Sequence, residues 1–260
     1  MLIESNGIKI YCELSGKPDA PVVVLSHSLG SSMVMWEPQL TVLEPDFRVV
    51  RYDMRGHGES EVSGGAYSLE MLGQDVVGLL DALEIESAHF VGLSIGGMIG
   101  QGLGLDHSER LLSLALCDTA PILPQEAKPL FQERMDLARS QGMAPLVEGT
   151  LARWFTPPFL EKDPPMVDRI RAQIEATPVD GFIGCSHAIM GLNYIDRLAS
   201  IDLDTLIIVG EDDPGTPVTA AEAIHAEIPK SHLKVLPSAM HLCNIEQVEA
   251  FNNALMKFLT

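Results

Sequence analysis

A serine lies between glycines in the stretch FVGLSIGG, which spans residues 90–97. An apolar run precedes Ser94, and a helical pattern, SIGGMIGQGLGL, begins with it. Glycines on both sides permit a sharp turn from a strand into a helix and leave the hydroxyl uncrowded. The same turn places the Ile95 N–H at the start of a helix, where it can stabilise a developing oxyanion. We therefore predict that Ser94 is a nucleophile and that Ile95 is one oxyanion donor.

A nucleophilic serine needs a base, and the base needs a carboxylate that orients it. For a nucleophile at such a turn, the expected order along the chain is serine, acid and then histidine. Among the late histidines, His225 falls inside a predicted helix and His232 begins a predicted strand. His241 instead lies in a loop, PSAMHLCNIE, at the edge of the sheet that should also carry the serine. His241 is therefore the predicted base.

The acid is expected at the end of the run TLIIVG, which is followed by Asp212 and Asp213 in GEDDPGTP. Successive side chains leaving a strand point in opposite directions, so only one of the two can face the histidine. We predict Asp213 as the acid and Asp212 as a solvated or turn-forming carboxylate. Asp118, at the end of the neighbouring run LLSLALCDT, is the alternative acid.

A second oxyanion donor is usually found in the loop after the run VVVLS, which here reads HSLG. Its small residues would let the backbone approach a substrate, and we predict that Leu29 supplies the N–H. We interpret His27 in this loop as a bracing residue. The polar segment RYDMRGHGES, at 51–60, could form a second catalytic cluster. We favour instead a hydrogen-bonded turn that supports the rim of the site, as loop charges generally do.

Short apolar runs recur along the chain and predict the strands that must carry these residues. Each run is too continuous for a half-exposed strand and is typical of a parallel sheet that is buried on both faces. A hairpin is predicted around Asn6 and Gly7. The runs lie at 21–26, 47–53, 88–94, 111–119, 204–213 and 232–237.

Helical patterns fill most of the gaps between these runs. Apolar residues form one stripe in 68–83 and another in 244–259, with Asn244 as the expected N-cap of the second helix. Thr216 followed by Pro217 predicts the start of a further helix. Strands alternating with helices predict an α/β fold, with a mostly parallel central sheet flanked by helices.

Residues 121–200 interrupt this alternation, because they contain no clear strand, several prolines and helical patches rich in Met and Phe. We predict that 121–200 form a helical cap inserted between strands of a core made of 1–120 and 201–260. Such a cap would cover a site at the carboxyl edge of the sheet. Four of its apolar side chains suit a substrate pocket or merely pack the cap, namely Met143, Phe159, Met166 and Met190.

Composition limits the classes of partner. The chain has 260 residues and a formal net charge of −19, which disfavours nucleic acid and anionic membranes as partners. No segment approaches the ~18 apolar residues of a membrane helix, and the first residues lack the pattern of a signal peptide. The four cysteines form no CxxC pair, and no set of ligands has metal-site spacing. We therefore expect no metal and no cofactor, and a cytoplasmic location.

The motifs HSLG, RYDMRGHGES, GLSIGG, GEDDPGTP and MHLCNIE, in this order, resemble the α/β-hydrolase superfamily over essentially the whole chain. Within it, SLGSSMVMWEPQ, RYDMRGHG, LCDTAP and RWFTPPF are similar to 3-oxoadipate enol-lactonases, although related carboxylesterases share most of these strings. The resemblance implies an α/β-hydrolase fold without metal or cofactor. Many relatives have a glycine where this chain has Ser28, and the enol-lactonases tolerate serine there.

The resemblance also implies roles for the residues found above. Ser94, Asp213 and His241 would form the triad, and Leu29 and Ile95 would donate to the oxyanion. His241 would take the Ser94 proton as Ser94 attacks an ester or lactone carbonyl, and water would then hydrolyse the acyl-enzyme.

The substrate is predicted to be a small ester or lactone, with 3-oxoadipate enol-lactone as the first hypothesis. A carboxylate on that lactone would need a cation, for which the cap offers Arg153, with Trp154 as an apolar wall. The alternative is that Arg153 is a surface residue of a cap helix. Two other functions stay open, a broad-specificity short-chain carboxylesterase and a hydrolase-fold ligand receptor with slow turnover. A carbon–carbon bond hydrolase would use the same triad.

Overall fold

An eight-stranded sheet forms the centre of the computed structural model, which describes residues 1–162 and 164–260. The strand order is β1-β2-β4-β3-β5-β6-β7-β8. β2 pairs antiparallel with β1 and β4, and all later neighbours pair in parallel. The predicted mostly parallel sheet is therefore confirmed. The strands are β1 (Leu2–Ser5), β2 (Ile8–Gly16), β3 (Val22–Ser26), β4 (Arg48–Tyr52), β5 (Ala88–Leu93), β6 (Leu111–Cys117), β7 (Thr205–Gly210) and β8 (Ser231–Leu236).

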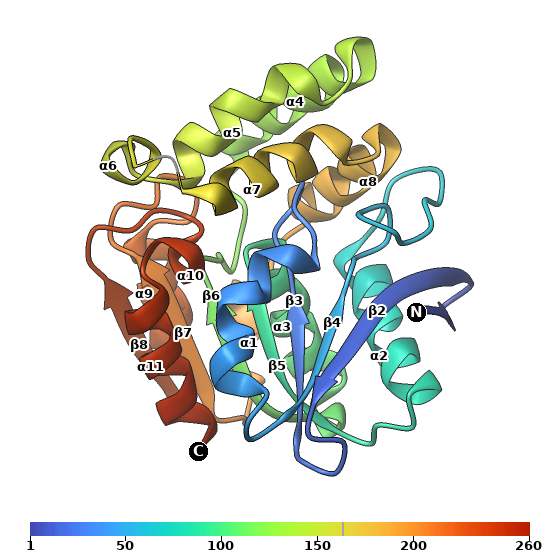
Figure 1. Ribbon diagram of the computed structural model, residues 1–260, viewed down its shortest axis with the longest axis vertical. Coiled ribbons are helices and arrows are strands. Elements are labelled where there is room, and N and C mark those ends of the chain that lie inside the picture. Colours follow the sequence, from blue (N-terminus) through green and yellow to red (C-terminus); the bar gives the residue numbers. More distant parts are fainter. Residues whose placement is uncertain (163) are drawn as a thin grey trace.

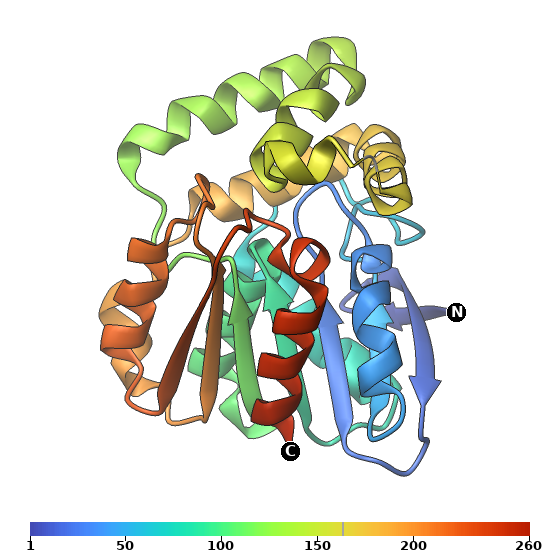
Figure 2. The same cartoon turned by 60° about the vertical axis from the view of Figure 1, so that its left-hand side comes forward.

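Helices cover both faces of the sheet (Figure 1), with α1 and α11 on one face and α2, α3 and α9 on the other. The helices α4–α8 form a further layer above the carboxyl ends of the parallel strands, as the rotated view also shows (Figure 2). We call 121–200, which contains this layer, the cap. The core helices are α1 (Glu37–Leu43), α2 (Leu69–Ala82), α3 (Ile95–Asp106), α9 (Val218–Glu227), α10 (Cys243–Glu246) and α11 (Val248–Leu259). The cap helices are α4 (Lys128–Gln141), α5 (Val147–Trp154), α6 (Pro157–Leu160), α7 (Pro165–Ala176) and α8 (Val179–Met190).

Burial explains why the predicted strands formed. Every residue of β3 and β7 is buried, as expected for strands with helices on both faces. The hairpin between β1 and β2 turns at Asn6 and Gly7, whose φ angles are 46° and 77°, the left-handed values that such a turn requires. Among the described residues, no helix has the length and apolar character to cross a membrane.

Two predicted helix starts are wrong. The stripe over 244–259 is divided into α10 and α11 at Gln247, and Asn244 lies inside α10 instead of capping a helix. The Asn244 side chain is buried in the core, where its amide donates to the Met35 carbonyl oxygen at 2.9 Å. Thr216 does not cap α9 either, because its hydroxyl donates to a carboxylate in the site described below.

The two connections between cap and core run side by side. Ile122 and Asn193 form an antiparallel bridge, and the Tyr194 N–H donates to the Pro121 carbonyl oxygen at 2.8 Å. These contacts join the beginning of the cap to its end. The cap therefore leaves and re-enters the core at one place, after β6 and before β7.

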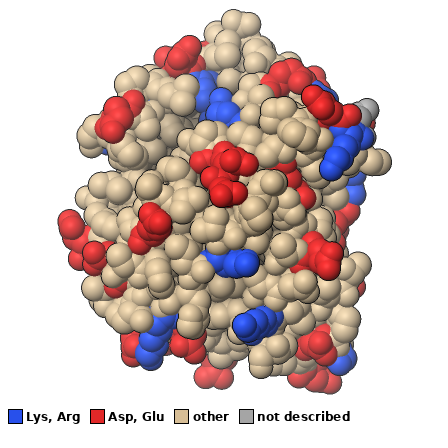
Figure 3. Space-filling model, turned by 90° about the vertical axis from the view of Figure 1, so that its left-hand side faces the viewer, with Lys and Arg blue, Asp and Glu red and all other residues tan. Residues whose placement is uncertain are grey.

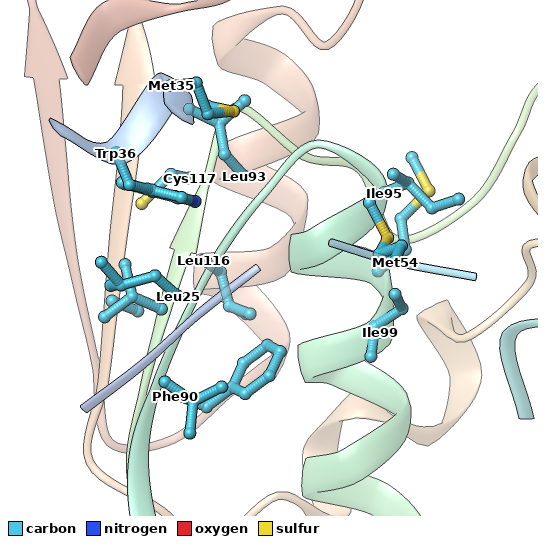
Figure 4. Close-up of a cluster of buried hydrophobic side chains, with 14 of the residues drawn as sticks. Leu25, Met35, Trp36, Met54, Phe90, Leu93, Ile95, Ile99, Leu116 and Cys117 are labelled. Atoms are coloured by element: carbon cyan, nitrogen blue, oxygen red, sulfur yellow. The ribbon is translucent and has the colours of Figure 1, made fainter. Parts of the chain in front are cut away.

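The turn at Ser94 rests on apolar side chains. Leu93 and Ile95 are fully buried, and Figure 4 shows them in the core cluster, with Leu93 near Met35 and Ile95 near Met54. Burying a side chain of this size stabilises a fold by about 1.5–3 kcal/mol. Both neighbours of Ser94 are thus anchored in the core, which holds the turn in place.

Candidate active site

Ser94 occupies a strained turn between β5 and α3. Its φ is 60° and its ψ is −119°, a conformation that costs a non-glycine residue on the order of 1–3 kcal/mol. Close packing around the turn explains the flanking glycines. A Cβ on Gly92 would lie 2.2 Å from the Gly96 carbonyl oxygen, and a Cβ on Gly96 would lie 2.4 Å from the Ser26 carbonyl oxygen. Larger residues could not form this turn without displacing the backbone.

Two residues at the end of β6 brace the same turn. The Ser94 N–H donates to the Cys117 carbonyl oxygen at 2.9 Å. The Thr119 hydroxyl donates to the Ser94 carbonyl oxygen at 2.8 Å. The N–H and the carbonyl oxygen of Ser94 are thus both held by hydrogen bonds, and Ser94 lines a cavity below the cap.

His241 lines the same cavity and is paired with Asp213. Its Nδ1 lies 2.8 Å from Asp213 Oδ2. The carboxylate also accepts the Thr216 hydroxyl at 2.6 Å and the Gly215 N–H at 2.8 Å. Asp213 is buried, whereas its neighbour Asp212 is exposed. The structure therefore brings Ser94, His241 and Asp213 to one cavity.

The pair shifts the pKa of both partners. Burial alone would lower the pKa of His241, but the Asp213 carboxylate outweighs it, and the pKa is raised. Burial alone would raise the pKa of Asp213, but His241 and the hydrogen bond from Thr216 lower it below the usual range. His241 is thereby made a stronger base. Since Nδ1 faces the carboxylate, Nε2 is the ring nitrogen left for a proton from a nucleophile.

Asp118, the alternative acid, lies behind this pair without a hydrogen bond to His241. It accepts the Gly210 N–H at 2.8 Å and the Cys243 thiol at 2.7 Å. Burial and the nearby Asp213 raise the pKa of Asp118 to about 8. The structure thus pairs His241 with Asp213 and gives Asp118 different partners.

Leu29 lies in a loop at the edge of the cavity, and the amides on both sides of it are occupied. The Ser28 N–H donates to Met35 Sδ at 3.3 Å, and the Gly30 N–H donates to His57 Nε2 at 3.0 Å. Within 1–162 and 164–260, the Leu29 N–H has no hydrogen-bond acceptor. This N–H is therefore available to a ligand, as is the Ile95 N–H at the first position of α3.

The segment 51–60 supports this loop, as the structural interpretation predicted. Burial, with His27 nearby, lowers the pKa of His57 to about 3, so its ring stays neutral and Nε2 accepts from Gly30. His27 Nε2 accepts the Met54 N–H at 2.9 Å in the same way. Arg55 is bound to the carboxylate of Asp75 on α2, outside the cavity.

The cavity between cap and core has a volume of about 420 Å³. The four apolar residues considered from the sequence, Met143, Phe159, Met166 and Met190, are absent from its wall. Its apolar lining comes from the cap and its connections, chiefly Ile122, Leu123, Leu130, Phe131, Trp154, Ile189 and Leu192. Trp154 also stacks on His241, with ring centroids 6.2 Å apart. The wall is thus shaped by different residues from those the composition of the cap suggested.

Two arginines, Arg153 and Arg134, line this apolar cavity. Arg153 is half-buried, and burial lowers its pKa. Burial, with Arg153 nearby, lowers the pKa of Arg134 to about 10. Arg134 Nε is buried without a hydrogen-bond partner. In the part of the chain that is described, neither arginine forms an ion pair.

Arg134 was missed from the sequence. Its contacts are one long hydrogen bond to the Thr150 hydroxyl, at 3.4 Å, and the ring of Phe182, 5.4 Å from the guanidinium carbon. One signal was present, because Arg134 stands on the same stripe of α4 as Phe131 and Met135. A charged residue on an apolar stripe is a candidate for a buried function.

Comparison with known proteins places this cavity in context. Residues 21–248 match the model of the alpha/beta hydrolase fold family. The 3-oxoadipate enol-lactonase 1 of Acinetobacter baylyi is 36% identical over 251 residues, which are 96% of this chain and 93% of that protein. The crystal structure of the enol-lactonase from Burkholderia xenovorans LB400 has a TM-score of 0.97 and 34% identity, covering 100% of this chain and 99% of that chain. A hydrolase from Pseudomonas aeruginosa PA01 has a TM-score of 0.96 and 39% identity, covering 100% and 97%.

Proposed function

The chain belongs to the α/β-hydrolase family, and from this premise we propose that it is a serine hydrolase that opens an enol-lactone bearing a carboxylate, with 3-oxoadipate enol-lactone as the substrate. The similarity to two enol-lactonases over nearly the whole chain supports a lactone or ester as the bond that is cleaved. The core, 1–120 and 201–260, would carry the triad, and the cap, 121–200, would carry the groups that select the substrate.

In the first step, His241 Nε2 takes the proton of the Ser94 hydroxyl as Ser94 Oγ attacks the lactone carbonyl carbon. Asp213 holds the imidazole through Nδ1 and stabilises the imidazolium that forms. The N–H groups of Leu29 and Ile95 donate to the oxyanion. One such donor typically contributes about 10²–10³ in rate.

In the second step, the carbonyl re-forms and the ring C–O bond breaks, and His241 returns the proton to the enol oxygen. That oxygen stays tethered to the acyl group, so nothing leaves the enzyme at this stage. Water then attacks the ester carbonyl carbon with His241 as the base, Ser94 Oγ leaves with the returned proton, and a single ring-opened acid is released.

The two unpaired arginines are the observation that carries the choice of substrate. Arg134 and Arg153 line an apolar cavity together with Ser94 and His241. Both arginines are half-buried, and neither forms an ion pair with a described residue. A guanidinium held in an apolar cavity without a counter-charge is costly, so the two together favour a ligand of opposite sign. On the face shown in Figure 3, lysines and arginines are interspersed with acidic side chains and form no continuous basic patch that could attract an anion there.

The test compares two substrates on the same enzyme. We expect efficient hydrolysis of 3-oxoadipate enol-lactone, slow hydrolysis of neutral p-nitrophenyl acetate, and loss of both in Ser94→Ala. Faster turnover of the neutral ester than of the lactone would identify a broad carboxylesterase. No turnover of either, combined with tight binding of the lactone, would identify a ligand receptor and overturn the proposal.

A further inference from the structure

His241 stands in a loop, and a loop by itself positions a side chain poorly. The N–H groups of both neighbouring residues are nevertheless held by hydrogen bonds. The Met240 N–H donates to Glu246 Oε2 at 2.9 Å, and the Leu242 N–H donates to the Trp154 carbonyl oxygen at 3.1 Å. Trp154 belongs to the cap, so one of these two bonds comes from outside the core.

The other bond also leads to the cap. Oε1 of Glu246 accepts two hydrogen bonds from Thr156, one from its N–H at 3.0 Å and one from its hydroxyl. Thr156 lies between α5 and α6, and Figure 1 shows α6 above α10, the helix that ends with Glu246. One carboxylate therefore joins the segment before His241 to the segment after Trp154.

We propose that Glu246 is a positioning residue that fixes His241 relative to the cap, so that cap and base move as one unit. Arg153 and Trp154 line the cavity and lie three and two positions before Thr156, the residue that Glu246 holds. A substrate that contacts Arg153 or Trp154 would therefore affect the position of His241. The inference rests on the proposed role of His241, and the experiment below separates the two.

Glu246→Gln is the main variant, because glutamine keeps the shape but presents an NH₂ group to one of the donors that the carboxylate accepts. Glu249→Gln is the matched control, since Glu249 is exposed on α11 and the charge change is the same. We expect Glu246→Gln to lower kcat roughly 10- to 100-fold with KM within about threefold, as a misplaced catalytic group would. The control should retain the kcat of the native enzyme.

A second readout does not depend on turnover. Trp154 stacks on His241, so protonation of the imidazole should quench Trp154 fluorescence, with Trp154→Phe identifying that signal. Glu246→Gln should weaken the quenching, whereas Glu249→Gln should not. If the lactone is not a substrate, this titration still tests the contact between the cap and His241.

Thr156 provides a pair of variants in case Glu246→Gln does not fold. Thr156→Val removes the hydroxyl that donates to Glu246, and Thr156→Ser restores it. We expect the valine variant to lower kcat and weaken the quenching, and the serine variant to recover both. Native kcat and native quenching in Glu246→Gln, or equal values for the valine and serine variants, would overturn the inference.

Discussion

Arg134→Met should make the enzyme both less active on a carboxylated lactone and more stable. Methionine has a similar length and no charge, so the cavity keeps its shape while one of two guanidinium groups is lost. Arg134 Nε has no hydrogen-bond partner. Burial, together with the nearby charge of Arg153, lowers the pKa of the Arg134 guanidinium to about 10. A guanidinium whose pKa is lowered in the folded state opposes folding at neutral pH, and its removal should raise Tm.

The effect on activity follows from the strength of one charge-assisted hydrogen bond. Such a bond contributes about 1.5–3 kcal/mol. This corresponds to a fall of roughly 10- to 150-fold in kcat/KM for the carboxylated lactone. A neutral ester makes no such bond, and its kcat/KM should change by less than about threefold.

Arg139→Met is the control, because Arg139 stands on the same helix and pairs with Asp136 at the surface. It should leave both rates and Tm close to native values. Steady-state rates on the two substrates and thermal unfolding at pH 7 measure all three quantities. If Arg134→Met lowered kcat/KM equally for the lactone and the ester, or lowered Tm, the proposal that Arg134 binds an anionic ligand would be refuted.

Three further predictions concern the carboxylates and the base. Asp213→Asn should lower kcat by about 10⁴, because an amide facing Nδ1 favours the wrong tautomer of His241, and steady-state kinetics on either substrate will show it. Because the pKa of His241 is raised, kcat/KM should increase with pH through an apparent pKa above that of a free histidine, which a pH–rate profile measures. The raised pKa of Asp118 means that its stabilising contribution is complete below the pKa of the unfolded carboxyl and is lost as pH rises towards about 8. Asp118→Asn should therefore raise Tm relative to the native protein, and by clearly more at pH 9 than at pH 5.

Most of the core could be predicted from the sequence, because its signals are local. Continuous apolar runs became β3 and β7, which are buried on both faces, and Asn6-Gly7 became the hairpin turn. The glycines around Ser94 predicted a turn that only small residues allow. Each of these features depends on residues that are close together along the chain.

The failures come from contacts between distant segments. The apolar stripe over 244–259 favours one helix, but the Asn244 amide bonds to Met35, more than 200 positions away, and the helix is divided at Gln247. Thr216 is a residue type that often caps helices, yet its hydroxyl donates a hydrogen bond to Asp213 instead. No local pattern states which partner a polar side chain will take.

The prediction of the cavity lining failed for a related reason. Methionines and phenylalanines in the cap all looked suitable, and only the folded arrangement separates those that pack the cap from those that face the core. Arg134 lay on an apolar stripe, where a charge is unexpected, but the missing partner that makes it informative is visible only in three dimensions. A sequence can show that a residue is unusual without showing what surrounds it.

Two groups at this site oppose folding, and each would serve the proposed chemistry. Ser94 is strained at φ 60°, and Arg134 is half-buried with its Nε left without a hydrogen-bond partner. The apolar core beneath the turn, including Leu93 and Ile95, supplies stability that offsets these costs. Relaxing the strain would withdraw the hydroxyl, and pairing the arginine within the protein would remove the attraction for an anion. Stabilising substitutions at these positions should therefore lower activity, whereas stabilising substitutions elsewhere in the core should not.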